Sequence, residues 1–417
     1  MKALNKYSAI ALAILVIAFL VDSISPNKSQ KSATQKTSPS VQIDSASANL
    51  KWVTAYLVSW NHYAAPGGAW GNLPTEAIDW SAFTHMIYFA FGARADGSIS
   101  PEIKQYNNMN PDRLNAITSS AHAHHVPVLF AIGGWGNYDG FSKAITPAVR
   151  PVFIRNLISL MNQWHFDGID IDMEPIKDSD LSNYTDFIKE LRSDLNKLNV
   201  PASDTPILTA AVGWQPQLFA QLQDQFDQIN VMAYDMSGAW GRGWVTWFNT
   251  PLYNTDRTFW GSDKLLPSVD ERVKRFINAG INTQKLGLGI DFYGYVWNGG
   301  SGTTTGGVTA PQQHWSEAPK VQSNVPYFDI MDKYYKPDRY HWDSEADVPY
   351  LGINENGDSN DKFISYDDEK SIEKKVEYAK KYHMGGVFIY DISAGYRKDA
   401  APGSRDKLLQ AVKESVK

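Results

Sequence analysis

Acidic side chains occupy alternate positions in residues 166–175, which read Phe-Asp-Gly-Ile-Asp-Ile-Asp-Met-Glu-Pro. On a β-strand, Asp170, Asp172 and Glu174 would share one face, and the apolar residues between them would take the other. Their carboxyls would then lie roughly 6–7 Å apart. Three like charges at this spacing cannot all ionise freely, so at least one pKa should rise. The pattern therefore predicts a proton donor that works near neutral pH.

Two other interpretations of this segment are less favoured. A calcium loop of the form D-x-[DN]-x-[DN]-G needs a glycine after its third ligand, where this chain has Met173. A solvated edge strand would also carry alternating acids, but the flanking sequence is apolar enough to be buried.

The residues Asp167, Asp170, Asp172 and Glu174 form a DxxDxDxE pattern. The pattern resembles the signature of glycoside hydrolase family 18, the chitinases and their relatives, and the resemblance extends from Trp52 onward. It implies that Glu174 is the general acid and base, while the substrate's own acetamido oxygen attacks the anomeric carbon. It also implies that Asp172 orients the acetamido nitrogen and stabilises the oxazolinium intermediate, with Asp170 behind it.

A second motif, Ala-Ile-Gly-Gly-Trp at 131–135, resembles the SxGG motif of the same family. It begins with alanine where the family usually has a serine that holds the first aspartate of the acidic triplet. We therefore expect Asp170 to depend on Tyr56 alone for support. The resemblance implies that Trp135 stacks on a sugar at the aglycon side.

A third motif, Met-Ala-Tyr-Asp at 232–235, matches the family's MxYD motif. The match implies that Tyr234 donates its hydroxyl to the acetamido group and that Asp235 contacts the same sugar. Trp240 follows as a second stacking candidate.

Two positions depart from the family pattern. The segment that begins at Phe292 resembles an FYGR motif but has Tyr295 in place of arginine, and Tyr390 stands where the family has a tryptophan floor. Tyrosine and tryptophan both offer a flat face to a sugar, so Tyr390 should still stack on it, with less contact area. The candidate catalytic residues are Glu174, Asp172, Asp170 and Tyr234, and the candidate substrate-binding residues are Tyr56, Phe91, Gly134, Trp135, Met232, Asp235, Trp240, Tyr293 and Tyr390.

Composition narrows the classes of partner. The 417 residues are 43% hydrophobic and 20% charged, which suits one barrel-sized core. A net charge of −6 argues against a nucleic-acid partner. The chain has no cysteine and its nine histidines show no metal-ligand spacing, so we expect no metal and no cofactor. The expected partner is chitin or a chitooligosaccharide.

The apolar segments alternate between strand and helix patterns, which is typical of a parallel β/α fold. Eight strands are predicted at Val53–Ser59, Thr84–Phe91, Pro127–Ile132, Gly168–Glu174, Ile207–Val212, Gln228–Tyr234, Leu286–Phe292 and Gly386–Asp391. Helices are predicted at Val149–Trp164, Leu181–Leu198, Gln215–Gln225, Val269–Ala279, Glu369–Tyr382 and Asp406–Val416. This order predicts an α/β fold, a (β/α)8 TIM barrel with its active site at the carboxyl ends of the strands.

The segment between residues 292 and 386 is too long for one connection of such a barrel. It is rich in glycine, aromatic and turn residues. The family resemblance implies a small α+β insertion subdomain, at 295–366, between strands seven and eight.

The amino-terminal residues predict export. Lys2 and Lys6 precede an apolar run at 9–21, so 1–22 is predicted to be a signal peptide or a short anchor. The Ser- and Lys-rich segment 23–50 is predicted to be a disordered linker, and 51–417 the catalytic barrel. The expected location is secreted or periplasmic, with membrane contact through the amino-terminal segment if it is not cleaved.

Together these features predict a secreted chitinase that cleaves β-1,4 linkages between N-acetylglucosamine units with retention. An endo-β-N-acetylglucosaminidase and a peptidoglycan-active hydrolase remain alternatives. A non-catalytic lectin on the same scaffold is less favoured because Glu174 is present.

Overall fold

The computed structural model describes residues 49–62, 73–100, 102–103, 106–107, 110–198, 205–241, 243–355 and 359–417. The predicted signal peptide, and all but the last two residues of the predicted linker, lie outside the described residues.

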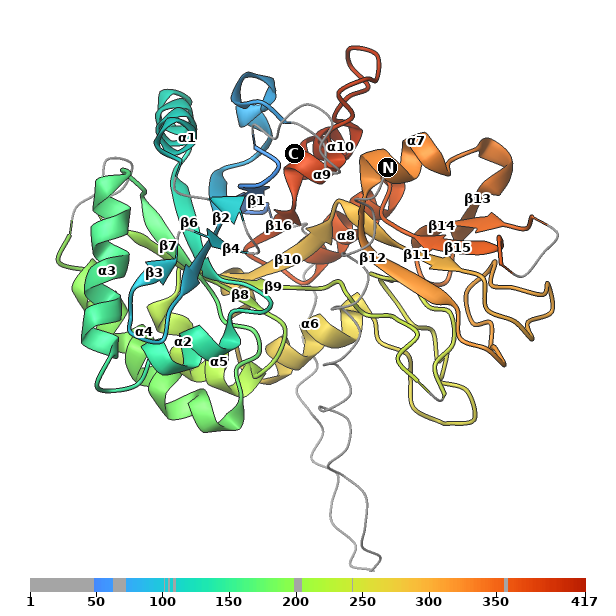
Figure 1. Cartoon of the computed structure of the whole chain (residues 1–417), viewed down its shortest axis with the longest axis horizontal. Coiled ribbons are helices and arrows are strands. Elements are labelled where there is room, and N and C mark those ends of the chain that lie inside the picture. The colour runs from blue at the N-terminus through green and yellow to red at the C-terminus, as the bar shows by residue number, and fades with distance from the viewer. Residues whose placement is uncertain are drawn as a thin grey trace, which may run out of the picture.

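Eight parallel strands form a closed barrel, which confirms the predicted fold class (Figure 1). In chain order they are β1 (Trp52–Val58), β2 (His85–Ala93), β6 (Val128–Gly133), β7 (Gly168–Asp172), β8 (Ile207–Val212), β9 (Gln228–Val231), β10 (Leu286–Asp291) and β16 (Gly386–Tyr390). Strand β1 pairs with both β2 and β16, and this double pairing closes the ring. The short strands β3 (Ile99–Ser100), β4 (Glu102–Ile103) and β5 (Tyr106–Asn107) follow β2.

Helices cover the outside of the barrel, because each buries an apolar stripe against the outward face of the strands. They are α1 (Pro111–Ala123), α2 (Tyr138–Ala144), α3 (Arg150–Gln163), α4 (Leu181–Leu195), α5 (Pro216–Leu222), α6 (Val269–Asn278), α8 (Glu369–Lys381) and α10 (Lys407–Ser415), with a short α9 (Ile392–Gly395). Helices α1 and α2 have no counterpart among the predicted helices. No helix within the described ranges is long and apolar enough to span a membrane.

The side chains of β7 alternate between an outer core, against the helices, and the interior of the barrel. Ile169 and Ile171 belong to the outer core between strands and helices, together with Phe153 of α3 and Phe187 of α4. The opposite face of β7 points into the barrel, where aromatic side chains from the neighbouring strands are packed. The period-two pattern of the sequence therefore predicts correctly which face of β7 is acidic.

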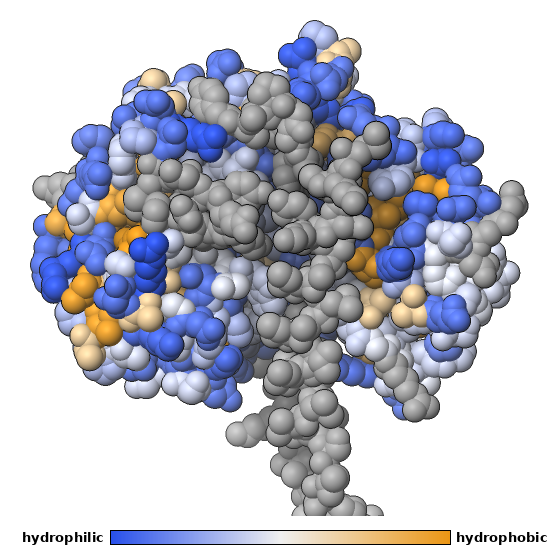
Figure 2. All heavy atoms as spheres, viewed as in Figure 1, coloured by the Kyte–Doolittle hydropathy of each residue, from blue (hydrophilic) through white to orange (hydrophobic). Residues whose placement is uncertain are grey.

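A five-stranded antiparallel sheet lies between β10 and β16, which confirms the predicted insertion. It contains β11 (Tyr293–Asn298), β12 (Lys320–Pro326), β13 (Tyr340–Asp343), β14 (Val348–Ile353) and β15 (Lys362–Ser365), with α7 (Tyr327–Lys333) after β12. Figure 1 shows this sheet to the right of the barrel. Where side chains are coloured in Figure 2, this view of the surface is mostly hydrophilic, with hydrophobic residues in separate areas.

Candidate active site

The three acidic residues of the β7 segment run from the barrel interior toward its mouth. Asp170 is fully buried and Asp172 is 4% exposed. Strand β7 ends at Asp172, and Glu174 lies two residues further on, half-buried. The outermost carboxyl is therefore the most exposed of the three.

Two hydroxyl groups hold Asp170. Tyr56 donates to its Oδ2 at 2.9 Å, and Thr209 donates to its Oδ1 at 2.5 Å. The expectation that Tyr56 is the sole support is therefore wrong. Thr209 lies directly across from Asp170 in the register of β7 and β8, which places its hydroxyl beside the carboxyl.

Burial raises the pKa of Asp170 to about 6, and the hydrogen bonds from Thr209 and Tyr56 oppose that rise. Burial also raises the pKa of Asp172 well above its ordinary value, and the charges of Glu174 and Asp170 add to the effect, as does a hydrogen bond with Glu174. The Oδ1 atom of Asp172 is buried and has no hydrogen-bond partner among the described residues. The triplet therefore favours partial protonation and leaves one acceptor free for a ligand.

Asp167, the first residue of the acidic pattern, is structural. It is fully buried at the start of β7, and its Oδ2 accepts from the backbone N–H of Val128 at 2.8 Å. The same oxygen lies 2.8 Å from Nε2 of His122, and this contact joins α1 to the barrel.

A hollow at the carboxyl ends of β7 and β8 contains Glu174. Its lining includes the predicted residues Trp135 and Met232, together with Trp214. Trp135 is 48% exposed and Trp214 is 51% exposed, so both rings are available to a ligand. Trp214 is absent from the predicted site. Its position two residues after β8 is the signal that would have found it, because this edge of a barrel carries the active site.

An aromatic group surrounds Tyr390 at the end of β16. The ring centroid of Tyr390 lies 5.4 Å from that of Phe89, 5.7 Å from that of Tyr56 and 6.1 Å from that of Tyr234. Burial raises the pKa of Tyr234 well above its ordinary value, so its hydroxyl keeps the proton that it would donate.

Phe91 does not line this group, and its assignment to the site is wrong. Its side chain is fully buried in the outer core, with its ring centroid 5.7 Å from that of Phe130. Phe89 takes the inward position instead. The ladder between β2 and β6 shifts register between Tyr88 and Phe91, so simple alternation along this strand fails.

Asp235 accepts hydrogen bonds from two tyrosines of β11. The hydroxyl of Tyr293 lies 2.7 Å from Oδ1 of Asp235, and that of Tyr295 lies 2.8 Å from the same oxygen. Tyr295, noted in the sequence only as a replaced arginine, is thus part of this cluster. Trp240 packs against Trp244, with ring centroids 4.6 Å apart, and is not among the residues that line the hollow.

Gly134 connects β6 to the acidic strand through its backbone. Its N–H donates to the carbonyl oxygen of Asp172 at 2.7 Å. Its φ is +92°, and a Cβ at this position would lie 2.9 Å from Cζ of Phe89. The N–H of Gly134 is thus occupied by Asp172, and Gly134 shapes the site through this backbone contact.

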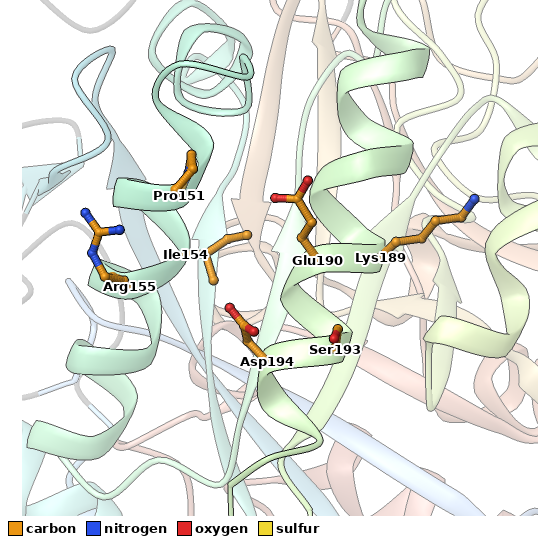
Figure 3. A pocket seen from close by; sticks show the side chains of 7 residues that line it. All are labelled: Pro151, Ile154, Arg155, Lys189, Glu190, Ser193 and Asp194. Carbon is orange, nitrogen blue, oxygen red and sulfur yellow. The ribbon is translucent and has the colours of Figure 1, made fainter.

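A second hollow lies on the outer surface between α3 and α4 (Figure 3). Charged helix residues such as Arg155, Lys189 and Asp194 line it, and none of the predicted site residues does. Within the described ranges, no group of three histidine, aspartate or glutamate side chains is arranged to hold a metal ion.

Comparisons with known proteins find matches over most of the chain. The sequence model described as "Glycosyl hydrolases family 18" matches residues 53–395. The chain is 29% identical over 342 residues to "Chitinase A1" of Niallia circulans, which covers 76% of this chain and 44% of that protein. It is 30% identical over 282 residues to a "Probable endochitinase" of Caenorhabditis elegans, which covers 63% of this chain and 43% of that protein. The chain thus spans less than half the length of these two relatives.

A solved structure shares the fold. The Group IV chitinase of Ostrinia furnacalis, crystallised with allosamidin, aligns with a TM-score of 0.72 at 23% identity. The alignment covers 87% of this chain and 98% of that one. At this identity the likeness supports the barrel architecture.

Proposed function

The chain belongs to the glycosyl hydrolases family 18, and on that premise we propose that it is a chitinase. It hydrolyses β-1,4 linkages between N-acetylglucosamine units with retention of configuration. The observation that carries the proposal is the placement of Glu174 in a hollow flanked by two exposed tryptophans, at the open end of a buried acidic row.

Glu174 acts as the general acid. It is the outermost carboxyl of the row and lines the hollow, so it can reach the leaving oxygen of a bound sugar. After the bond breaks, the same group accepts the proton of the incoming water, as microscopic reversibility requires. A hydrogen bond joins it to Asp172, whose pKa is raised by burial and by the charge of Glu174.

Asp172 serves the substrate's acetamido group. Its buried Oδ1 has no partner among the described residues, so it can accept the acetamido N–H. That hydrogen bond would aim the acetamido oxygen at the anomeric carbon, which is the substrate-assisted route to retention. Asp170, held by Tyr56 and Thr209, lies behind it and supplies negative charge when ionised.

The aromatic residues bind the sugar rings. Trp135 and Trp214 offer exposed faces beside Glu174, and Tyr390 provides the floor at the end of β16. Tyr234 donates to the acetamido oxygen, and Asp235 contacts the same sugar.

The amino-terminal sequence supports export of the enzyme. A positively charged start followed by an apolar run at 9–21 is typical of a signal peptide. We assign the protein to the cell exterior or periplasm, with the amino-terminal segment as its membrane contact if it is retained. This places the enzyme where polymeric chitin or its oligomers would be available.

The test compares wild type, Glu174→Gln and the control Glu190→Gln on two aryl chitobiosides. One substrate carries the acetamido group at the cleaved sugar, and the other carries a free amine there. Wild type should hydrolyse the acetylated substrate with retention, and the amine at a rate lower by orders of magnitude. Glu174→Gln should lower kcat by about 10²–10⁴ while binding persists.

Glu190 pairs with Arg150 on the outer surface, so its variant should keep wild-type rates. Equal turnover of the two substrates, or an ester trapped on Asp172, would refute the acetamido nucleophile. Near-wild-type turnover by Glu174→Gln would refute the assignment of the acid. Release of whole glycans from a glycoprotein, with no action on chitin oligomers, would favour an endo-β-N-acetylglucosaminidase.

A further inference from the structure

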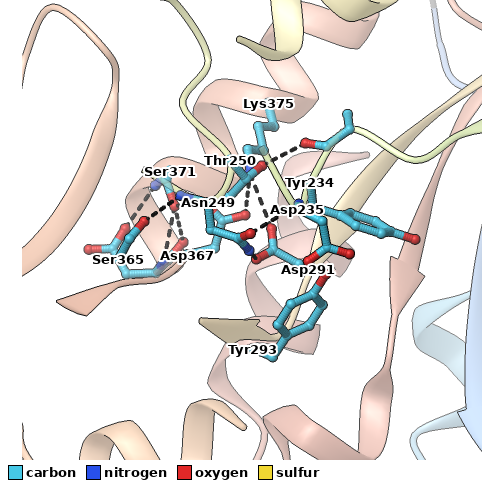
Figure 4. A network of polar contacts seen from close by, with 12 residues as sticks. Tyr234, Asp235, Asn249, Thr250, Asp291, Tyr293, Ser365, Asp367, Ser371 and Lys375 are labelled. Carbon is cyan, nitrogen blue, oxygen red and sulfur yellow. Dashed lines mark hydrogen bonds and ion pairs between the residues drawn. The ribbon is translucent and has the colours of Figure 1, made fainter. Parts of the chain in front are cut away.

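A buried polar network lies beside the active site, at the junction of the barrel and the inserted sheet (Figure 4). Its central members are Asn249, Asp291 at the end of β10, Asp367 after β15, and Lys375 of α8, and all four side chains are fully or almost fully buried. Segments distant in the sequence therefore meet in one cluster. Burying such groups costs free energy unless they are paired, so their arrangement calls for a role.

Asn249 connects the network to the active site. Its Oδ1 accepts from the backbone N–H of Asp235 at 3.0 Å, and its Nδ2 donates to Oδ2 of Asp291 at 2.6 Å. The backbone N–H of Asp235 can only donate, so the amide must turn its oxygen toward Asp235 and its Nδ2 toward Asp291. The backbone N–H of Asn249 donates to Oγ of Ser365 at 2.8 Å, which anchors the residue to the inserted sheet.

The backbone that Asn249 contacts is strained. Asp235 has a φ of +56°, in the left-handed region that residues with a Cβ rarely adopt. This conformation accompanies the hydrogen bonds that its carboxylate accepts from Tyr293 and Tyr295. An acceptor for the Asp235 N–H stabilises the conformation, since an unpaired N–H would add to its cost.

Lys375 of α8 contacts the carboxyl of Asp291 on the side away from Asn249. Its Nζ lies 3.6 Å from Oδ1 of Asp291, contacts Oδ2 of Asp367 and donates to Oγ1 of Thr250 at 2.6 Å. Burial and the charge of Asp367 raise the pKa of Asp291 well above its ordinary value, and the charge of Lys375 opposes that rise. With Oδ1 of Asp291 facing Lys375, Oδ2 is the oxygen that accepts from the Asn249 amide.

We propose that Asn249 is a positioning residue for hydrolysis, oriented by Asp291 and Lys375, and that it acts by holding Asp235 in its left-handed conformation. The inference rests on the proposed function, because it assumes that Asp235 contacts the bound sugar. It assigns the inserted sheet and α8 a part in the alignment of the active site.

A double-mutant cycle tests the inference. Asn249→Ala and Asp235→Ala are made singly and together, and kcat and KM are measured on a chitooligosaccharide. If Asn249 acts through Asp235, Asn249→Ala should lower kcat/KM about tenfold or more in the wild-type background. In the Asp235→Ala background it should change kcat/KM by less than about twofold.

Asn254→Ala is the matched control. Asn254 lies on the same connection and donates to the carbonyl oxygen of Leu266 at 2.8 Å, so its loss removes one side-chain hydrogen bond that does not involve Asp235. Its effect on kcat/KM should be less than about twofold in both backgrounds. Equal effects of Asn249→Ala with and without Asp235 would show a purely structural role and overturn the inference.

The outcomes separate the inference from the proposed function. An inactive wild-type protein overturns both, whereas an active wild type with additive mutations overturns the inference and leaves the function intact. If Asn249→Ala does not fold by near-ultraviolet circular dichroism, the cycle is run with Asp291→Asn. This variant keeps Asn249 but puts an amide in place of the carboxyl that accepts from its Nδ2, and the same loss of effect in the Asp235→Ala background is required.

Discussion

Asp170 has no contact with water, yet it carries a carboxyl whose two oxygens each accept one hydroxyl hydrogen bond. Hydroxyl donors stabilise the ionised form, whereas burial stabilises the neutral form. Burial has the larger effect, so the pKa of Asp170 rises to about 6. A negative charge on Asp170 near neutral pH therefore lowers the free energy of unfolding. Proteins retain costs of this kind at functional sites.

The sign of this cost gives a prediction for Asp170→Asn. In the unfolded chain the pKa of aspartate is about 3.9, and in the folded protein that of Asp170 is about 6. Protonated Asp170 favours the folded state, so its contribution is full below about pH 4 and is lost as the pH rises through 6. Asparagine does not ionise, so Asp170→Asn should gain up to about 3 kcal/mol relative to wild type above pH 6. Chitinase activity should fall.

Thermal unfolding of both proteins between pH 4 and pH 8 measures this difference, with the exposed Asp263→Asn as the control. A stability difference that does not change with pH would show that Asp170 ionises normally in the folded state.

At the residue scale the acidic row was predictable because a local period of two places its members together. Thr209 was not, because its contact with Asp170 depends on the register between β7 and β8, and a single sequence does not state register. Tyr295 was noticed only as a departure, and its partner Asp235 lies on another segment of the chain. Phe91 was misplaced because the register shift in β2 interrupts the alternation.

At the scale of elements, the turn after β6 shows how backbone contact shapes the site. Gly133 and Gly134 have φ values of +116° and +92°, and a Cβ on Gly133 would lie 2.0 Å from the carbonyl oxygen of Asp172. The two glycines therefore let β6 approach the acidic strand, which side chains at these positions would prevent.

Gly134→Ala should both destabilise the protein and slow the enzyme. The new methyl group would lie 2.9 Å from Cζ of Phe89, whose ring packs 5.4 Å from that of Tyr390. Gly136 is the matched control, because its φ is +95° but a Cβ there would have no atom within 4 Å. Both substitutions carry a similar backbone cost of about 1–3 kcal/mol, and only Gly134→Ala should also raise KM. Equal KM values in the two variants would show that the Phe89 and Tyr390 rings do not respond to the turn.

Element prediction succeeded where strands were apolar and helices had a broad apolar stripe. Helix α1 was missed because its buried face consists of a few residues, Leu114, Ile117, Thr118 and Ala121, within a polar sequence. Helix α2 has seven residues, too few for a clear period. The insertion was predictable from length, but the order of its five strands was not, since antiparallel pairing depends on contacts across long loops.

At the scale of the whole molecule, the fold class followed from the alternation of strands and helices, whereas the ties between distant segments did not. Asn249, Asp291 and Lys375 are separated in sequence, and each looks like an ordinary polar residue in its own segment. Their meeting is a consequence of barrel closure and of the inserted sheet. Such networks form only when distant segments meet in the folded chain, so no single segment of the sequence predicts them.

Barrel closure also predicts where the chain can be shortened. Strand β1 carries Tyr56 and pairs with β2 on one side and β16 on the other, and the N–H of Lys51 donates to the carbonyl oxygen of Gly385 at 2.7 Å. A protein that begins at residue 49 keeps all these contacts, so it should unfold cooperatively and hydrolyse soluble chitooligosaccharides at the full-length rate. A protein that begins at residue 59 lacks β1, which leaves two strand edges unpaired and Asp170 without its tyrosine. It should be insoluble or show no cooperative transition by circular dichroism, whereas a folded and active protein of this length would contradict the role of β1 in closing the barrel.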